Sequence, residues 1–112
     1  MTKIVTKSNL TTMLNDASPE KQAQIIGRAC WALFLRQTAA EQASNDTVEH
    51  NTIGFSGSDG KSGSLTAKYW RKHGTLAEWQ VERWTRDWRG APRIVKYWKQ
   101  LNEIAVQKQA AA

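Results

Sequence analysis

Residues 18–43 read SPEKQAQIIGRACWALFLRQTAAEQA, and this stretch decides the fold class. Ser18, Pro19 and Glu20 suit an N-cap, a first helical position and a first turn, because a helix start exposes N–H groups and the positive end of its dipole. Large apolar residues then occupy nearly every face, which is typical of a central, buried helix. We predict this helix over residues 19–43. The apolar residues that recur near helical spacing are Ile25, Ile26, Ala29, Leu33 and Ala40.

Further start and stop signals predict four more helices. Ser8 and Ser64 are candidate N-caps, Gly74 suits the position after a helix end, and Thr75 with Glu78 has the spacing of a capping box. Pro92 suits the start of a last helix. The expected helices span residues 9–15, 19–43, 65–73, 76–89 and 92–108. The expected inward-facing residues of the last two are Ala77, Val81, Trp84, Trp88, Ile94, Tyr97, Trp98, Leu101, Ile104 and Ala105.

Residues 44–64 are rich in glycine, serine and asparagine, which predicts a long loop. Ile53 and Phe55 are its large apolar residues, and we expect them to pin it to the core. No convincing strand pattern occurs anywhere in the chain. The sequence therefore predicts one all-α domain over residues 1–112, a bundle of four to five helices with a Gly/Ser-rich loop in the middle.

Composition excludes several classes of protein. The chain has 112 residues, which fits one domain and not an enzyme with its site in a cleft between two domains. Cys30 is the single cysteine, so no intrachain disulfide forms, and a reducing, cytoplasmic setting is expected. Its apolar neighbours indicate a small buried hydrophobe rather than a nucleophile. No signal peptide is expected, and the longest apolar stretch, residues 25–35, is too short to cross a membrane.

Motifs for catalysis, cofactors and metals are weak. Gly60-Lys61-Ser62 resembles the end of a phosphate-binding loop, but Phe55 stands where that loop needs its first glycine. His50 and His73 lack the spacing of metal ligands and are typical of a solvated surface. We therefore expect no cofactor, no metal and no catalytic residue, and place an enzyme last among the functions.

Positive charge is concentrated in the C-terminal half. Residues 61–112 hold eleven of the sixteen lysines and arginines, four of the ten acidic residues and five of the six tryptophans. On the expected helix 76–89, Trp79, Arg83 and Arg86 share the face opposite the core. Guanidinium groups grip phosphates and an indole stacks on bases, so this pattern favours a nucleic-acid surface. The candidate nucleic-acid-binding residues are Lys68, Arg71, Lys72, Trp79, Arg83, Arg86, Arg89, Arg93, Lys96 and Lys99.

Short motifs over residues 34–105 carry a family resemblance. The run at 34–42 belongs to it, and the other pieces are Asn51-x-x-Gly54-Phe55, Asp59, Leu65-x-Ala67, Leu76-x-x-x-Gln80 and Lys96-Tyr97-x-x-Gln100-Leu101. Together they resemble short proteins of phages and other mobile elements, and are similar to C-terminal segments of some helicase-like DNA enzymes. The extra tryptophans and the arginine-rich fourth helix depart from that pattern. The resemblance implies that the protein belongs to a mobile element and interacts with proteins that act on DNA. It implies no catalytic residue.

Two functions follow as hypotheses. The first is a small basic protein of a phage or mobile element that binds nucleic acid, DNA in preference to RNA, and acts in DNA metabolism. The second is an inhibitor or adaptor that binds a host nucleic-acid or defence complex, because Trp and Arg also dominate protein interfaces. Neither hypothesis involves a membrane.

Overall fold

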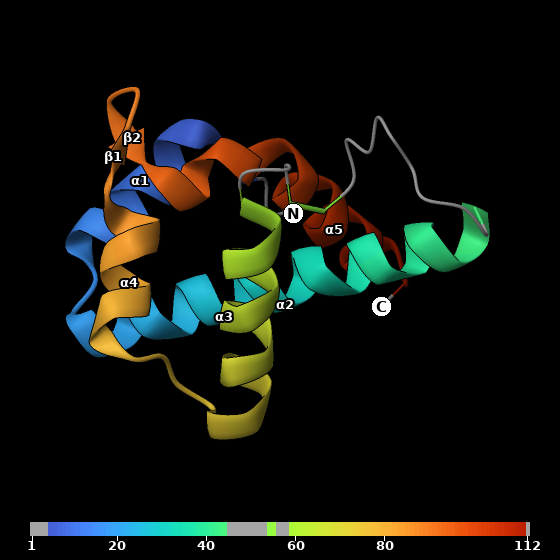
Figure 1. Cartoon of the computed structure of the whole chain (residues 1–112). Helices are drawn as coiled ribbons and strands as arrows, with labels where there is room; N and C mark the ends of the chain where they lie inside the picture. Colours follow the sequence, from blue (N-terminus) through green and yellow to red (C-terminus); the bar gives the residue numbers. More distant parts are fainter. Residues whose placement is uncertain (1–4, 45–53, 56–58, 112) are drawn as a thin grey trace.

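The all-α prediction is confirmed in a computed structural model that describes residues 5–44, 54–55 and 59–111 (Figure 1). Helices dominate, and one small hairpin joins α4 to the last helical segment. The elements are α1 (Lys7–Asp16), α2 (Pro19–Ser44), α3 (Gly60–His73), α4 (Glu78–Thr85), β1 (Asp87–Trp88), β2 (Ala91–Pro92), the 3-10 helix η2 (Arg93–Tyr97) and α5 (Trp98–Ala111). No helix within the described ranges is long and apolar enough to cross a membrane.

Helix α2 is the central element, as predicted, and it starts where the sequence placed it. The Ser18 hydroxyl accepts a hydrogen bond from the Lys21 N–H at 3.2 Å, which caps the helix start. Ile26 and Leu33 are fully buried. Its most extensive contact is with α3. The two helices approach closely at Gly27, where an added Cβ would lie 2.4 Å from the Trp70 ring.

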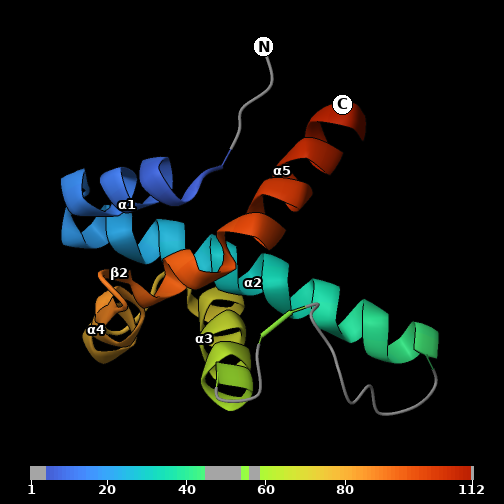
Figure 2. The same cartoon turned by 90° about the horizontal axis from the view of Figure 1, so that it is seen from above.

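Helix α1 begins two residues earlier than expected, because Thr6 rather than Ser8 caps it. The Thr6 hydroxyl accepts from the Asn9 N–H at 3.1 Å, and the Asn9 side chain accepts from the Thr6 N–H at 2.8 Å. This reciprocal pair satisfies two N–H groups at once, an arrangement that Ser8 has no matching residue to form. Figure 2 shows α1 alongside the first half of α2.

Helix α3 corrects the loop prediction, because it begins at Gly60 and not at residue 65. Gly63 lies inside this helix, and a Cβ there would lie 2.5 Å from the Phe55 ring. Phe55 is buried, so its expected role of pinning the loop to the core is confirmed. Ile53 and most of the expected loop lie outside the described residues. The helix ends at Gly74, whose φ of 71° confirms its predicted position after the helix end.

Helix α4 is shorter than predicted at both ends. It starts at Glu78 because the Gln80 side chain accepts a hydrogen bond from the Ala77 N–H at 2.9 Å, so the expected Thr75 capping box is wrong. It ends at Thr85 because the following residues form an antiparallel hairpin, which the sequence did not predict. The turn of this hairpin places Arg89 at φ 53° and Gly90 at φ 87°. Positive φ at both central residues matches the right-handed twist of paired strands.

The last helical segment is also divided, into η2 and α5, where one helix was expected. Trp84 is fully buried beneath it, and its indole N–H donates to the Thr66 hydroxyl at 3.0 Å. Trp88 was expected in the core but is half-exposed, because it lies on β1. Ile104 on α5 is likewise only half-buried. Figure 2 shows why: α5 projects away from the bundle.

Candidate nucleic-acid interface

The carboxylate of Asp59 lies at the centre of the basic half of the molecule, although the side chain itself is fully buried. Arg93 places its Nη2 at 2.6 Å and its Nε at 2.8 Å from Oδ1. The Lys96 ammonium and the Tyr97 hydroxyl donate to Oδ2 at 3.0 Å and 2.6 Å. Arg83 approaches Oδ1 at 3.7 Å. We call these five residues the Asp59 network.

Three cations thus surround one anion, and this imbalance sets the electrostatics of the network. Burial alone raises the pKa of the Asp59 carboxyl. Hydrogen bonds from Tyr97, Arg93 and Lys96, together with the charge of Lys96, outweigh burial and hold the pKa below its ordinary value. The carboxylate is therefore ionised at neutral pH. The three cations around this carboxylate are partly exposed, so the network presents positive charge at the surface.

Two polar donors beside the network also lack acceptors. The Gln80 side-chain N–H₂ and the Arg83 Nε are buried and have no hydrogen-bond partner among the described residues. Both residues lie on α4, one helical turn apart. Buried donors of this kind are rare in proteins. The Gln80 amide thus adds partial positive charge beside the network, whereas the Arg83 Nε belongs to a cation that is already part of it.

The hairpin extends the basic surface beyond the network. The Arg89 guanidinium lies 4.7 Å and the Lys96 ammonium 5.3 Å from the centre of the Trp88 ring. Cation–π attraction at this range favours keeping the three groups together. Arg86, at the end of α4, is exposed beside them. The hairpin thus adds two exposed arginines to one side of the Asp59 network.

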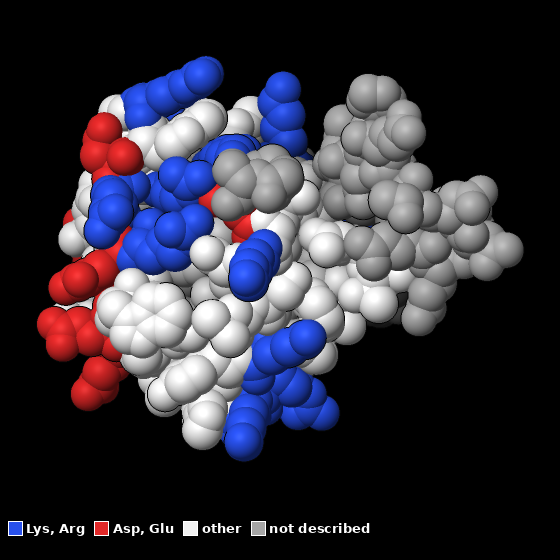
Figure 3. All heavy atoms as spheres, in the orientation of Figure 1, with Lys and Arg blue, Asp and Glu red and all other residues white. Residues whose placement is uncertain are grey.

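Helix α4 presents Trp79 to solvent, as predicted from its position, and the side chain is 55% exposed. On α3, Leu65 is 52% exposed and lies between the exposed Lys61 and Lys68. Figure 3 shows this side of the molecule. Basic side chains gather over the end of α4 that leads into the hairpin and again at the C-terminal end of α3, and acidic side chains line the outer edge next to α4. We call this the α3–α4 face.

The remaining candidates lie away from the Asp59 network. Lys68 and Arg71 reach the aromatic rings of Phe34 and Trp31 on α2, at 5.7 Å and 5.8 Å. Lys99 lies 5.8 Å from the Trp98 ring on α5. The structure therefore brings Arg83, Arg93 and Lys96 together on Asp59, and Arg89 and Lys96 together on the Trp88 ring. Trp79 is exposed on α4 and Arg86 directly follows α4, whereas Lys68, Arg71 and Lys72 belong to α3 and Lys99 to the start of α5.

Residues quoted for the family resemblance meet in and around this network. Gln100 accepts a hydrogen bond from the Gly54 N–H at 2.7 Å and donates to the Gly54 carbonyl at 2.9 Å. The Phe55 ring packs edge-on against Tyr97, whose hydroxyl holds Asp59. Sequence reasoning did not nominate Asp59 as a site residue. Its place within the motif was the one signal for it.

The structure offers little for other chemistry. The described part of the chain holds no group of three or more His, Cys, Asp or Glu that could bind a metal ion. Burial, together with the Asp59 charge, raises the pKa of the Cys30 thiol, which makes it a poor nucleophile. His73 packs on Tyr69 with ring centres 4.3 Å apart, and His50 lies outside the described residues. Comparisons with protein-family models, curated proteins and solved structures found no match to this chain.

Proposed function

We propose that the protein binds nucleic acid, DNA in preference to RNA, through phosphate contacts on the α3–α4 face and the adjoining hairpin. The observation that carries the proposal is the Asp59 network, which gathers three partly exposed cations around one buried carboxylate. Arg86 and Arg89 are exposed beside it. Phosphate groups of a strand suit such a surface because each contact releases condensed counterions.

Two kinds of cation would contact the phosphates, those that also hold Asp59 and those that lie outside the Asp59 network. Arg93 and Lys96 are engaged with the buried carboxylate, so their positions are fixed before any ligand arrives. Arg86 and Arg89 are exposed, and Arg89 lies against the Trp88 ring, so both present their guanidinium groups to solvent. Trp79, exposed on the helix that Arg86 follows, supplies an aromatic surface for a base. The setting we propose is DNA metabolism in a phage or mobile element, which rests on the family resemblance, and the cytoplasm remains its expected compartment.

A salt series tests this function directly. Labelled single- and double-stranded DNA and RNA are titrated with the full chain at low and near-physiological salt. We expect binding that weakens steeply with salt and a preference for DNA. The double variant Arg86→Ala, Arg89→Asn should bind more weakly at every salt concentration and lower the salt slope by about 1 for each phosphate that is no longer neutralised. Asparagine is chosen at residue 89 because it tolerates the positive φ there.

The matched control removes two exposed cations elsewhere, with Lys7→Ala on α1 and Lys21→Ala on α2. It has the same net charge as the test variant, so it separates a local surface from overall charge. Equal weakening in both variants, or no binding by the unmodified protein at low salt, would overturn the proposal.

A second function has one observation in its favour. Trp79 and Leu65 are large apolar side chains that are more than half exposed, and exposed Trp beside Arg is typical of protein interfaces. This favours an inhibitor or adaptor of a host nucleic-acid or defence complex. Trp79→Ala separates the two functions. It should abolish capture of a host protein if the adaptor hypothesis holds, and should weaken strand binding only moderately if the first hypothesis holds, because phosphate contacts would remain.

A further inference from the structure

A second basic and aromatic region lies on the other side of α2, between α2, α3 and α5. It is a hollow of about 630 Å³ that is partly open to solvent. This size falls within the range of small-molecule sites, roughly 300–1,000 Å³. Its lining comprises Arg28, Trp31, Ala32, Leu35, Arg36, Trp70, Ile104 and Gln107.

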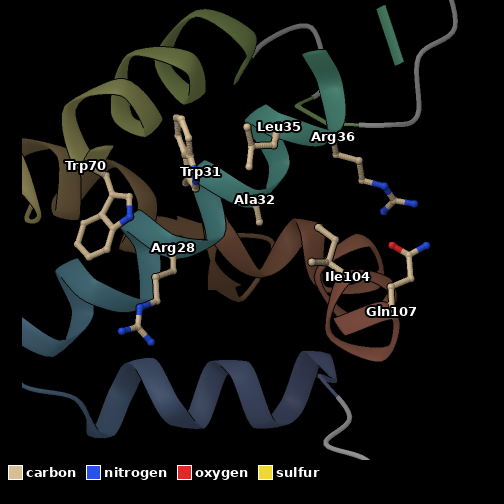
Figure 4. Close-up of a pocket in the computed structure, with 8 residues that line it drawn as sticks. All are labelled: Arg28, Trp31, Ala32, Leu35, Arg36, Trp70, Ile104 and Gln107. Carbon is tan, nitrogen blue, oxygen red and sulfur yellow. The ribbon is translucent and has the colours of Figure 1, made fainter. Parts of the chain in front are cut away.

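The lining is ordered by charge. Figure 4 shows Arg28 and Arg36 at opposite ends of the row that α2 contributes, with Trp31, Ala32 and Leu35 between them. The spacing of these five residues places them on one stripe of α2. Trp70 enters from α3, and Ile104 and Gln107 from α5. The middle of the hollow is therefore apolar and aromatic, and its two ends are cationic.

The two arginines differ in how far their charge is compensated. The Arg36 guanidinium pairs with Glu103 at 2.5 Å and donates to the Gln100 carbonyl at 3.4 Å. Arg28 is exposed, and within the described ranges the structure gives it neither an ion pair nor a hydrogen bond. No acidic side chain of the described residues lines the hollow. The site therefore carries one uncompensated positive charge, at the Arg28 end.

The aromatic walls are held in place by their own contacts. Trp31 packs on Phe34 with ring centres 5.8 Å apart and has the Arg71 guanidinium at 5.8 Å from its ring. Trp70 lies against Gly27, where even a Cβ would not fit. Rigid walls reduce the loss of side-chain freedom on binding. Leu35, by contrast, is 49% exposed, so the hollow offers apolar surface to a ligand that enters from solvent.

From these features we propose that the hollow binds a small aromatic anion, a flat ring carrying one anionic group. The ring lies on the apolar middle between the indoles, and the anionic group pairs with the Arg28 guanidinium. A nucleoside monophosphate and an aromatic carboxylate share this chemistry and are its two natural sources. The site is separate from the α3–α4 face, so it does not depend on the proposed function.

Calorimetric titration of the full chain tests the ligand class. The probes are adenosine monophosphate and indole-3-acetate, which have both ring and charge, adenosine, which has the ring alone, and inorganic phosphate, which has the charge alone. We expect one or both aromatic anions to bind with a Kd below about 1 mM, and adenosine and phosphate to bind at least about tenfold more weakly. The tighter of the two anions identifies the source. Failure of both anions to bind, or equal binding of adenosine and its monophosphate, overturns the proposal.

Variants locate the site. Arg28→Gln should weaken the aromatic anion about tenfold or more, because it removes a charge-assisted hydrogen bond. Leu35→Glu should weaken it through repulsion, whereas Leu35→Gln, of nearly the same shape, should retain most of the binding. Residues 28 and 35 are both exposed, so these variants should fold. Lys72→Ala, an exposed cation on α3 outside the hollow, should leave the affinity unchanged. Unchanged binding in Arg28→Gln would refute this location.

Discussion

The Asp59 network and the hollow beside α2 both contain arginines and aromatic rings, but they differ in whether the cations contact a buried carboxylate. In the network, Arg83, Arg93 and Lys96 converge on a carboxylate that is fully buried. In the hollow, Arg36 pairs with Glu103, whose side chain is 55% exposed, and Arg28 has no partner among the described residues. In the first region the cations therefore surround a carboxylate that has no access to water, and in the second the one paired cation meets a carboxylate that water reaches.

This difference shows that a count of basic residues does not identify a binding surface. Arg83, Arg93 and Lys96 would be nominated by any charge-based argument, yet part of their charge is used to stabilise Asp59. Arg28 belongs to the half of the chain with slightly negative net charge, yet it is the less engaged cation. A cation that contacts a carboxylate is partly neutralised by it, whereas Arg28 has no such partner among the described residues.

The largest effect on stability is expected from Asp59→Asn. This change leaves three cations around a neutral amide and removes the anion that holds them together. Loss of one partner of a buried ion pair costs about 3–5 kcal/mol in the free energy of unfolding. Urea unfolding followed by tryptophan fluorescence measures it. Asp87→Asn, on the exposed strand β1, is the control and should shift stability by less than about 0.5 kcal/mol. Similar losses in the two variants would contradict the central role of Asp59.

Lowering the pH should remove part of the same free energy of unfolding in the unmodified protein, because it protonates Asp59. The pKa of Asp59 is lower in the folded chain than in the unfolded one, so its contribution is fully present above the unfolded pKa of about 3.9. It is lost as pH falls below that value and through the folded pKa. Unfolding in urea between about pH 7 and pH 2 should therefore show stability falling most steeply below about pH 4. In Asp59→Asn, stability should fall less between these pH values, because the variant has no carboxylate to protonate at residue 59. An identical pH profile in the variant would refute the contribution of Asp59.

A smaller effect on stability is expected from substitution of Gly63, whose lack of a side chain leaves room for Phe55 to pack against Tyr97 of the Asp59 network. A Cβ at this position would meet the Phe55 ring at 2.5 Å, so Gly63→Ala should displace the ring and destabilise the protein by about 1–3 kcal/mol. Gly60→Ala is the matched control in the first turn of the same helix, where a Cβ would meet nothing within 4 Å. It should be neutral or slightly stabilising, because alanine restricts the unfolded chain. Equal thermal stability of the two variants would contradict the close packing at Gly63.

Local signals in the sequence predicted the fold class and the central helix. Ser18, Pro19 and the apolar residues after them are enough to define α2, because caps and periodicity act within a few residues of each other. The start of α3 was not predictable in the same way. Glycines at 60 and 63 favour a loop by propensity, yet both lie in the helix. At residue 63 the Phe55 ring leaves no room for a Cβ, and this contact comes from outside the helix, where local sequence does not reveal it.

The candidate site shows the same limit. Trp79, Arg83 and Arg86 were expected on the outward face from helical spacing. Trp79 and Arg86 are exposed, whereas Arg83 is only partly exposed because it turns toward Asp59. The end of α4 and the half-exposed position of Trp88 depend on the hairpin, which is two residues long on each side and leaves no strand pattern to read. The role of Asp59 depends on η2 bringing Arg93, Lys96 and Tyr97 to a residue more than thirty positions earlier. Such long-range pairing has no counterpart in local sequence.

The smallest effect is expected from Glu103→Gln, the counterpart of Asp59→Asn in the second region. The Arg36–Glu103 pair is formed at the surface, where water solvates both charges and salt screens them. Its removal should cost less than about 1 kcal/mol, and that cost should shrink further at high salt. Urea unfolding of Glu103→Gln and Asp59→Asn under the same conditions compares directly the loss of an exposed carboxylate with the loss of a buried one. If the two variants lost similar stability, burial of the carboxylate would not be what separates the regions. If Glu103→Gln instead bound the aromatic anion more tightly, the freed Arg36 would be a second cation available to the ligand, as the layout of the hollow implies.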